Sequence, residues 1–201
     1  MTHDDWTGGG ATALGTHAPA TLASYTVLVS VRPSGVHDEM LEAPEVVAFA
    51  DQFGRDATAI DGRVRDAFVR ATAGHTAAVA NMIWIADVAP RVRVALDALF
   101  GPSETWPGRR RYPVADTGDA ISSFLESISM QVDAHHDASN ERPDAARAAL
   151  AIAEAMIRTP AAMPDSVVAA AHELLTPAEA VEAVLDGARR SAGKIETALA
   201  A

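Results

Sequence analysis

Hydrophobic positions recur at helical spacing from residue 44 to the C-terminus of this chain. Apolar residues three or four positions apart form one face of a helix, and glycine or proline separates successive stretches. The stretches predicted to be helical are 44–53, 59–74, 75–88, 91–101, 116–137, 143–158, 164–175 and 176–200. The pattern therefore predicts an all-α protein, a multi-helix bundle whose core lies between the apolar faces of its helices.

Several predicted helices have recognisable boundary residues. Thr176 is a suitable N-cap, Pro177 suits the first turn, and Glu179 follows Thr176 by three residues, which is the spacing of a capping box. Pro90 follows a strongly apolar stretch and is expected to end the helix before it. Gly101 is expected to close the next helix.

The N-terminal part of the chain follows a different pattern. Residues 1–21 are rich in glycine, alanine and threonine and have little to bury, so we expect a flexible arm. β-branched residues within 22–31 predict one short strand, and the Pro-Ser-Gly sequence at 33–35 predicts a turn. The predicted organisation is a flexible arm over 1–21 followed by a single helical domain over 22–201.

Composition narrows the class of protein. Hydrophobic residues make up 49% of the 201 residues and aromatic residues only 5%, which favours closely packed helices over a β-sandwich. The formal net charge is -11, and the single short basic run at 109–111 is interpreted as a solvated loop, so nucleic acid is an unsuitable partner. The absence of cysteine excludes disulfides, thiolate metal sites and thiol-based redox chemistry within this chain.

The sequence also bears on location. No apolar stretch reaches the length of a membrane span, and the N-terminus lacks the basic region of a signal peptide. We therefore expect a cytoplasmic protein that does not contact a membrane.

The helix predicted over 116–137 carries the candidate chemistry. On a helical wheel its core stripe consists of Ile121, Leu125, Ile128 and Val132. A polar strip bordering that stripe consists of Glu126, Ser129, Asp133 and His136, whereas His135 lies on the other edge. A carboxylate and an imidazole at such a border can face a pocket and have shifted pKa values. They can equally be ordinary hydrogen-bonded groups at the edge of a core.

The spacing of this strip resembles a known family motif. Glu126, Ser129, Val132 and His136 stand at the positions of the E-x-x-C-x-x-C-x-x-x-H motif of the AhpD-like superfamily, which includes alkylhydroperoxidases and carboxymuconolactone decarboxylases. The helical sequence from "AALAIAEAM" to "KIETAL" resembles the C-terminal half of those proteins, and "MIWIADVAPRVRVALDALFG" resembles the segment before the motif helix. The resemblance covers roughly residues 82–199 and implies an AhpD-like helical bundle that forms a homo-oligomer. Both motif cysteines are replaced, so the peroxidase cycle of the family is not carried over.

Three functions remain open. The resemblance implies a thiol-free enzyme for a small organic molecule, acting by decarboxylation, isomerisation or a related reaction. In it His136 would be the general acid or base, Glu126 would orient it, Ser129 would supply a hydrogen bond, and His135 would be the alternative histidine. The second function is a non-catalytic ligand-binding or assembly protein on the same fold. The third is an alkylhydroperoxidase-like protein that depends on thiols from elsewhere.

Other candidate sites are weaker. His135 and His136 are adjacent, so their side chains diverge on a helix and do not form a chelating i, i+4 pair. His172 is followed by Glu173, but no second histidine follows at the spacing of a zinc protease. We therefore expect neither a metal nor a cofactor. Trp106, in a loop rich in proline and glycine, is expected either to cover a pocket or to lie at the surface.

Overall fold

The protein is described by a computed structural model that covers residues 6–107, 117–133, 142–158 and 162–200. Every regular element within these ranges is a helix, so the prediction of an all-α multi-helix fold is confirmed. The helices are α1 Gly10–His17, α2 Pro19–Leu28, α3 Asp38–Leu41, α4 Pro44–Arg55, α5 Gly62–Ala71, α6 Thr76–Phe100, α7 Thr117–Asp133, α9 Pro143–Ile157, α10 Asp165–Leu174, α11 Pro177–Ser191 and α12 Lys194–Leu199.

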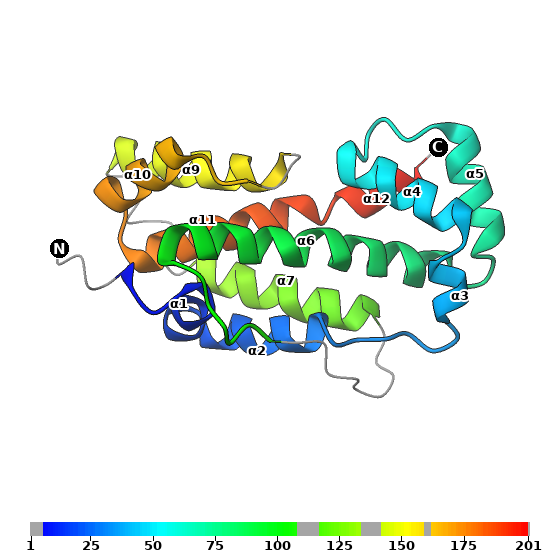
Figure 1. Cartoon of the computed structure of the whole chain (residues 1–201), viewed down its shortest axis with the longest axis horizontal. Helices are drawn as coiled ribbons and strands as arrows, with labels where there is room; N and C mark the ends of the chain where they lie inside the picture. Colours follow the sequence, from blue (N-terminus) through cyan, green and yellow to red (C-terminus); the bar gives the residue numbers. More distant parts are fainter. Residues whose placement is uncertain (1–5, 108–116, 134–141, 159–161, 201) are drawn as a thin grey trace.

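Two helices, α6 and α11, run side by side through the middle of the molecule (Figure 1). The pair α9 and α10 packs on one side of them, and α1, α2 and α7 pack on the opposite side. The helices α3, α4, α5 and α12 gather at one end, close to the beginning of α6. The core is thus organised around α6, which contacts helices in all three of these groups.

The central helix α6 continues through Pro90, so the prediction that Pro90 ends a helix is wrong. Proline in a helix interior removes one backbone hydrogen bond and costs about 3 kcal/mol. Val88 and Val92 on either side of it are fully buried, and the same buried face continues to Leu96 and Leu99. Burial of this long apolar face offsets the cost of the proline, because each buried valine or leucine contributes about 1.5–3 kcal/mol.

The beginning of α11 is fixed by the predicted capping box. The hydroxyl of Thr176 accepts a hydrogen bond from the backbone N–H of Glu179 at 3.2 Å, and the Glu179 carboxylate accepts one from the N–H of Thr176 at 2.6 Å. This prediction is confirmed. The chain turns at Gly193 before α12, so the stretch predicted as one helix over 176–200 is two helices.

The N-terminal segment differs most from its prediction. The strand predicted over 22–31 is wrong, because residues 19–28 form α2. The flexible arm is wrong for residues 6–21, where Leu14 of α1 is fully buried and Trp6 stacks on Phe100 with ring centroids 4.9 Å apart. Gly10 lets α1 approach α6, since a Cβ at this position would lie 2.8 Å from the Leu96 backbone.

A buried ionic cluster connects α6 to the ends of α4 and α9 and to the start of α12. Arg91 donates two hydrogen bonds to one carboxylate oxygen of Asp87, at 3.0 and 2.9 Å, and further bonds to the carbonyls of Met156, Arg158 and Gly54. Lys194 Nζ lies 3.6 Å from the other Asp87 oxygen. Burial lowers the pKa of Lys194, although the charge of Asp87 opposes that shift. The cluster positions the ends of α4 and α9 and the start of α12 against α6.

Candidate functional site

The polar strip predicted on α7 is only partly placed by the structure. Glu126 is exposed and Ser129 is half-buried. His135 and His136 lie outside the described residues. Glu126 and Ser129 line neither the groove along α6 nor the small cavity beside Arg91.

The buried face of α7 is rotated slightly from its prediction. Phe124 and Ile128 are fully buried, whereas Leu125 and Val132 are only partly buried. Ser127 faces α2, where its hydroxyl lies 2.9 Å from that of Ser24. The described part of α7 therefore serves mainly to pack against α2 and the core.

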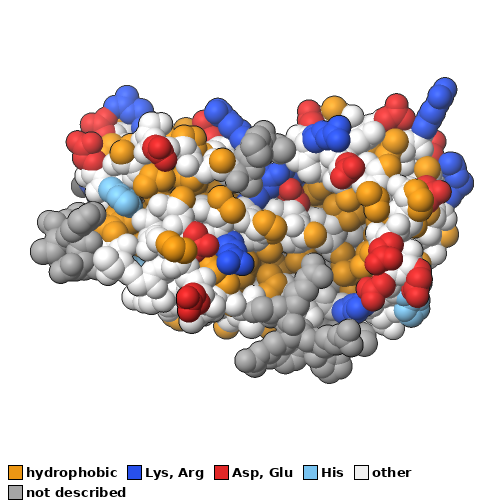
Figure 2. All heavy atoms as spheres, viewed as in Figure 1, with side chains coloured by type: hydrophobic (Ala, Val, Ile, Leu, Met, Phe, Trp, Pro, Cys, Tyr) orange, Lys and Arg blue, Asp and Glu red, His pale blue; other side chains and the backbone are white. Residues whose placement is uncertain are grey.

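A different feature, an open groove of about 1170 Å³, is a candidate site among the described residues. Its walls come from the end of α2, the segment 29–41, the middle of α6, and Trp106 with Pro107. In Figure 2, hydrophobic side chains lie along the middle of the molecule, over α6, and charged side chains lie around them. Small-molecule sites are typically clefts of about 300–1,000 Å³ with mostly apolar walls and a few polar groups, and this open groove is slightly larger.

The floor of the groove is one face of α6. Met82, Ile85, Ala86, Ala89 and Pro90 line it at the spacing of a single helical face. Ala86 and Pro90 are exposed and the other three are half-buried, so the described chain covers this apolar face incompletely. Arg93, at the far end, lies eleven positions after Met82, which makes the floor roughly 16 Å long at 1.5 Å per residue.

Pro90 also changes the polarity of this floor. Proline has no N–H, so the carbonyl of Ala86 lacks the donor that the fourth residue along a helix normally provides. Both residues line the groove. A hydrogen-bond acceptor is therefore placed at the middle of an otherwise apolar surface.

One end of the groove holds a cluster of polar and aromatic groups. The Tyr25 hydroxyl donates a hydrogen bond to the carbonyl of Ala89 at 3.3 Å, and its ring meets that of Trp106 edge to face at 6.1 Å. Trp106 Nε1 donates to one oxygen of Asp97 at 2.9 Å, while Arg93 Nε lies 3.5 Å from the other. Burial raises the pKa of Tyr25 to about 12, against a lowering effect of Arg93 and a further raising effect of Asp97. Tyr25 is therefore a neutral hydrogen-bond donor at physiological pH.

The opposite end lies near the beginning of α6. Gly35 there has a φ of 78°, and a Cβ at this position would lie 2.5 Å from His75 Cε1. Glycine is required by both the backbone conformation and the space. Arg32 forms an ion pair with Asp38, and Glu39 also lines this end.

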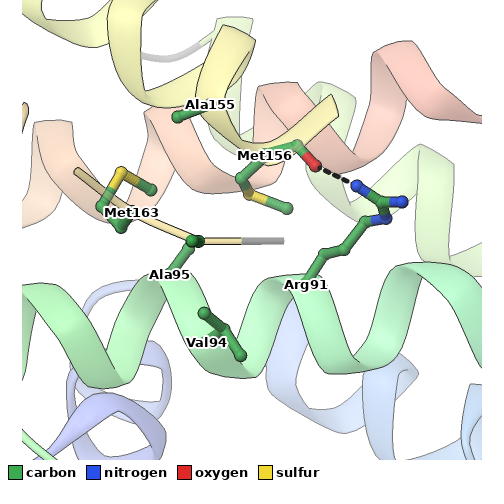
Figure 3. A pocket seen from close by; sticks show the side chains of 7 residues that line it. Arg91, Val94, Ala95, Ala155, Met156 and Met163 are labelled. Carbon is green, nitrogen blue, oxygen red and sulfur yellow. Dashed lines mark hydrogen bonds between the residues drawn. The ribbon is translucent and has the colours of Figure 1, made fainter. Parts of the chain in front are cut away.

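A second cavity, between α6 and the end of α9, is far smaller. Its volume is about 10 Å³, which is room for about one water molecule. Figure 3 shows Arg91 beside it, donating to the carbonyl of Met156 at 2.9 Å, with Met163 on the far side. Such a cavity belongs to the packing around Arg91 and is too small to be a ligand site.

Neither His172 nor a cluster of metal ligands provides a further candidate site among the described residues. His172 Nε2 donates a hydrogen bond to the carbonyl of Leu99 at 2.8 Å, and its ring packs against Trp6. In the described part of the chain, no group of three or more His, Cys, Asp or Glu side chains is placed to hold a metal ion. The same residues include no helix long and apolar enough to cross a membrane.

Comparison with protein-family models, with curated proteins and with solved structures finds no match to this chain. The resemblance to the AhpD-like superfamily therefore stays a prediction.

The groove was missed by sequence reasoning because its walls come from distant parts of the chain. Trp106 was the best signal, because it was expected either beside a pocket or at the surface, and it lines the groove. The second available signal was the apolar face of α6 around Pro90.

Proposed function

We propose that this protein binds a small, largely apolar organic molecule in the groove along α6. The observation that carries the proposal is the incompletely covered apolar floor from Met82 to Pro90. Exposed apolar surface is costly to maintain, and a contiguous patch of it rimmed by polar groups commonly marks a binding site. The proposal corresponds to the ligand-binding alternative raised by the sequence, on an all-α fold.

The walls favour a ligand of elongated shape. The floor is roughly 16 Å long and follows one helix face. Val29, Val31, Val36 and Leu41 add apolar side chains along its flank. The Tyr25 hydroxyl and the Ala86 carbonyl supply isolated polar contacts that would orient a bound molecule.

Acid–base catalysis by the strip on α7 stays a separate prediction, as does assembly into a homo-oligomer. Glu126 is exposed and does not line the groove, while His136 lies outside the described residues. A binding function needs neither residue.

The proposal is tested by filling the groove with a side chain. Ala86 is exposed on the floor, so Ala86→Trp would occupy ligand space without disturbing the core. Ala98 is exposed on the same helix outside the groove, so Ala98→Trp is a matched control. The measurement is the saturable fluorescence increase of Nile red, a neutral apolar dye.

We expect wild type and Ala98→Trp to bind the dye alike and Ala86→Trp to bind it about tenfold more weakly, or not at all. Thermal unfolding of both variants should match wild type, which would show that the loss is local. Failure of wild type to bind saturably, or equal binding by Ala86→Trp, would refute the proposal.

A further inference from the structure

We infer that the ligand of the groove is an amphipathic organic anion of the fatty-acid type, with its carboxylate at Arg93 and its apolar chain along α6. This inference rests on the proposed function and adds the chemical class and the orientation of the ligand. The observation behind it is the unequal distribution of charge between the two ends of the groove.

Arg93 has the capacity to bind a carboxylate. Its side chain is 58% exposed at the groove end, and within the described residues its one recorded partner is Asp97, which Nε approaches at 3.5 Å. This contact uses one edge of the guanidinium. The two terminal nitrogens present further N–H groups in the planar fork that matches a carboxylate.

The surroundings of Arg93 add a second donor. The ring of Tyr25 meets that of Trp106 at 6.1 Å, and Trp106 donates to the same Asp97 carboxylate that Arg93 approaches, so these side chains form one cluster. Tyr25 lines the groove, and its hydroxyl remains protonated at neutral pH. A carboxylate at Arg93 could therefore accept a hydrogen bond from this phenol in exchange for its long 3.3 Å bond to Ala89.

The opposite end is unsuitable for the same group. Asp38 and Glu39 both line it, and Arg32 is already paired with Asp38. Like charges at that end would repel a carboxylate, whereas Met82 and Leu41 beside it suit an apolar tail. Charge complementarity thus gives the ligand one orientation, with its anionic head towards the C-terminal half of α6.

The experiment compares three probes with the same apolar chain: decanoate, decanol and decyltrimethylammonium. Each is titrated as a competitor of Nile red, below its micelle concentration, against the full-length protein. Decanoate should displace the dye at the lowest concentration and decyltrimethylammonium at the highest. If Nile red binds and decanoate is no better than decanol, the inference fails while the proposed function stands.

Variants of Arg93 identify where the head binds. Arg93→Gln should weaken decanoate roughly tenfold, as expected for loss of a charge-assisted hydrogen bond, and leave decanol unchanged. Arg93→Lys keeps the charge and should restore part of the loss. Arg147, on α9, is also exposed and forms an ion pair with an aspartate of its own helix, Asp144, so Arg147→Gln is the control for net charge. Equal effects of Arg93→Gln and Arg147→Gln on decanoate would overturn the inference.

Discussion

Leu14→Ala should destabilise the whole protein, because α1 is part of the core. Leu14 is fully buried, and α1 contacts α2, α6 and α11. If residues 6–21 formed a flexible arm instead, truncating Leu14 would not affect stability.

The expected size of the effect follows from the burial of Leu14. Replacing a fully buried leucine by alanine removes its transfer free energy and leaves a cavity, at a cost of about 2–5 kcal/mol. A protein of this size loses about 2–4 °C of melting temperature per kcal/mol, so the melting temperature should fall by roughly 4–20 °C. Thr16 is exposed on the same helix, and Thr16→Ala should change the free energy of unfolding by no more than about 0.5 kcal/mol.

Urea unfolding followed by far-ultraviolet circular dichroism gives the measurement. The midpoint of Leu14→Ala should fall clearly while that of Thr16→Ala stays near wild type. Indistinguishable midpoints for Leu14→Ala and wild type would show that the N-terminal segment does not pack as described. The reasoning about the α1 interface would then be refuted.

Two other predictions concern the groove and α7. The pKa of Tyr25 is about 12 in the folded protein against 10.0 for a free phenol, so its neutral form favours folding. Its contribution of about 2–3 kcal/mol to the free energy of unfolding is fully present below pH 10 and is lost as pH rises from 10 to 12. Urea unfolding over that pH window should therefore show a smaller loss of stability in Tyr25→Phe than in wild type. If the strip on α7 catalyses acid–base chemistry, His136→Ala should lower turnover by about two to four orders of magnitude with circular dichroism unchanged. His135→Ala should be mild, and the reverse order would contradict the predicted helical frame.

The sequence predicted the helices best where side-chain periodicity and end signals agreed. Thr176 and Glu179 form the predicted capping box because that motif depends only on residues within one helical turn. Pro90 misled the prediction because its local cost is outweighed by burial over the full length of α6. Whether a proline that costs about 3 kcal/mol ends a helix cannot be decided until the tertiary contacts of that helix are known.

The N-terminal region was misread for a related reason. The β-branched residues of 22–31 favour a strand by composition, but propensity is a weak guide and tertiary packing overrides it. Thr21, Tyr25 and Leu28 are the buried residues of α2, and their spacing of four and three positions is helical. That spacing was present in the sequence and was the better signal.

The candidate site could not be predicted as a whole. The groove joins α2, the segment 29–41, α6 and Trp106, and no local pattern specifies that these segments meet. Only two local features of the groove were visible in the sequence: a proline within an apolar helix and a tryptophan in a loop. The proposed α7 strip was a local pattern, and local patterns of charge and histidine are common on helices that merely pack.

The net charge bears on how an anionic ligand could be held. A chain with a formal charge of -11 repels anions at long range, so electrostatic steering would slow rather than assist the approach of a carboxylate. Salt screens charges over about 8 Å at physiological ionic strength, which leaves the contact with Arg93 as the local favourable interaction. That exposed guanidinium already has Asp97 beside it, so its net attraction is modest. Burial of the ligand's chain along α6 must therefore supply most of the affinity, and Arg93 would determine which end of the ligand lies where.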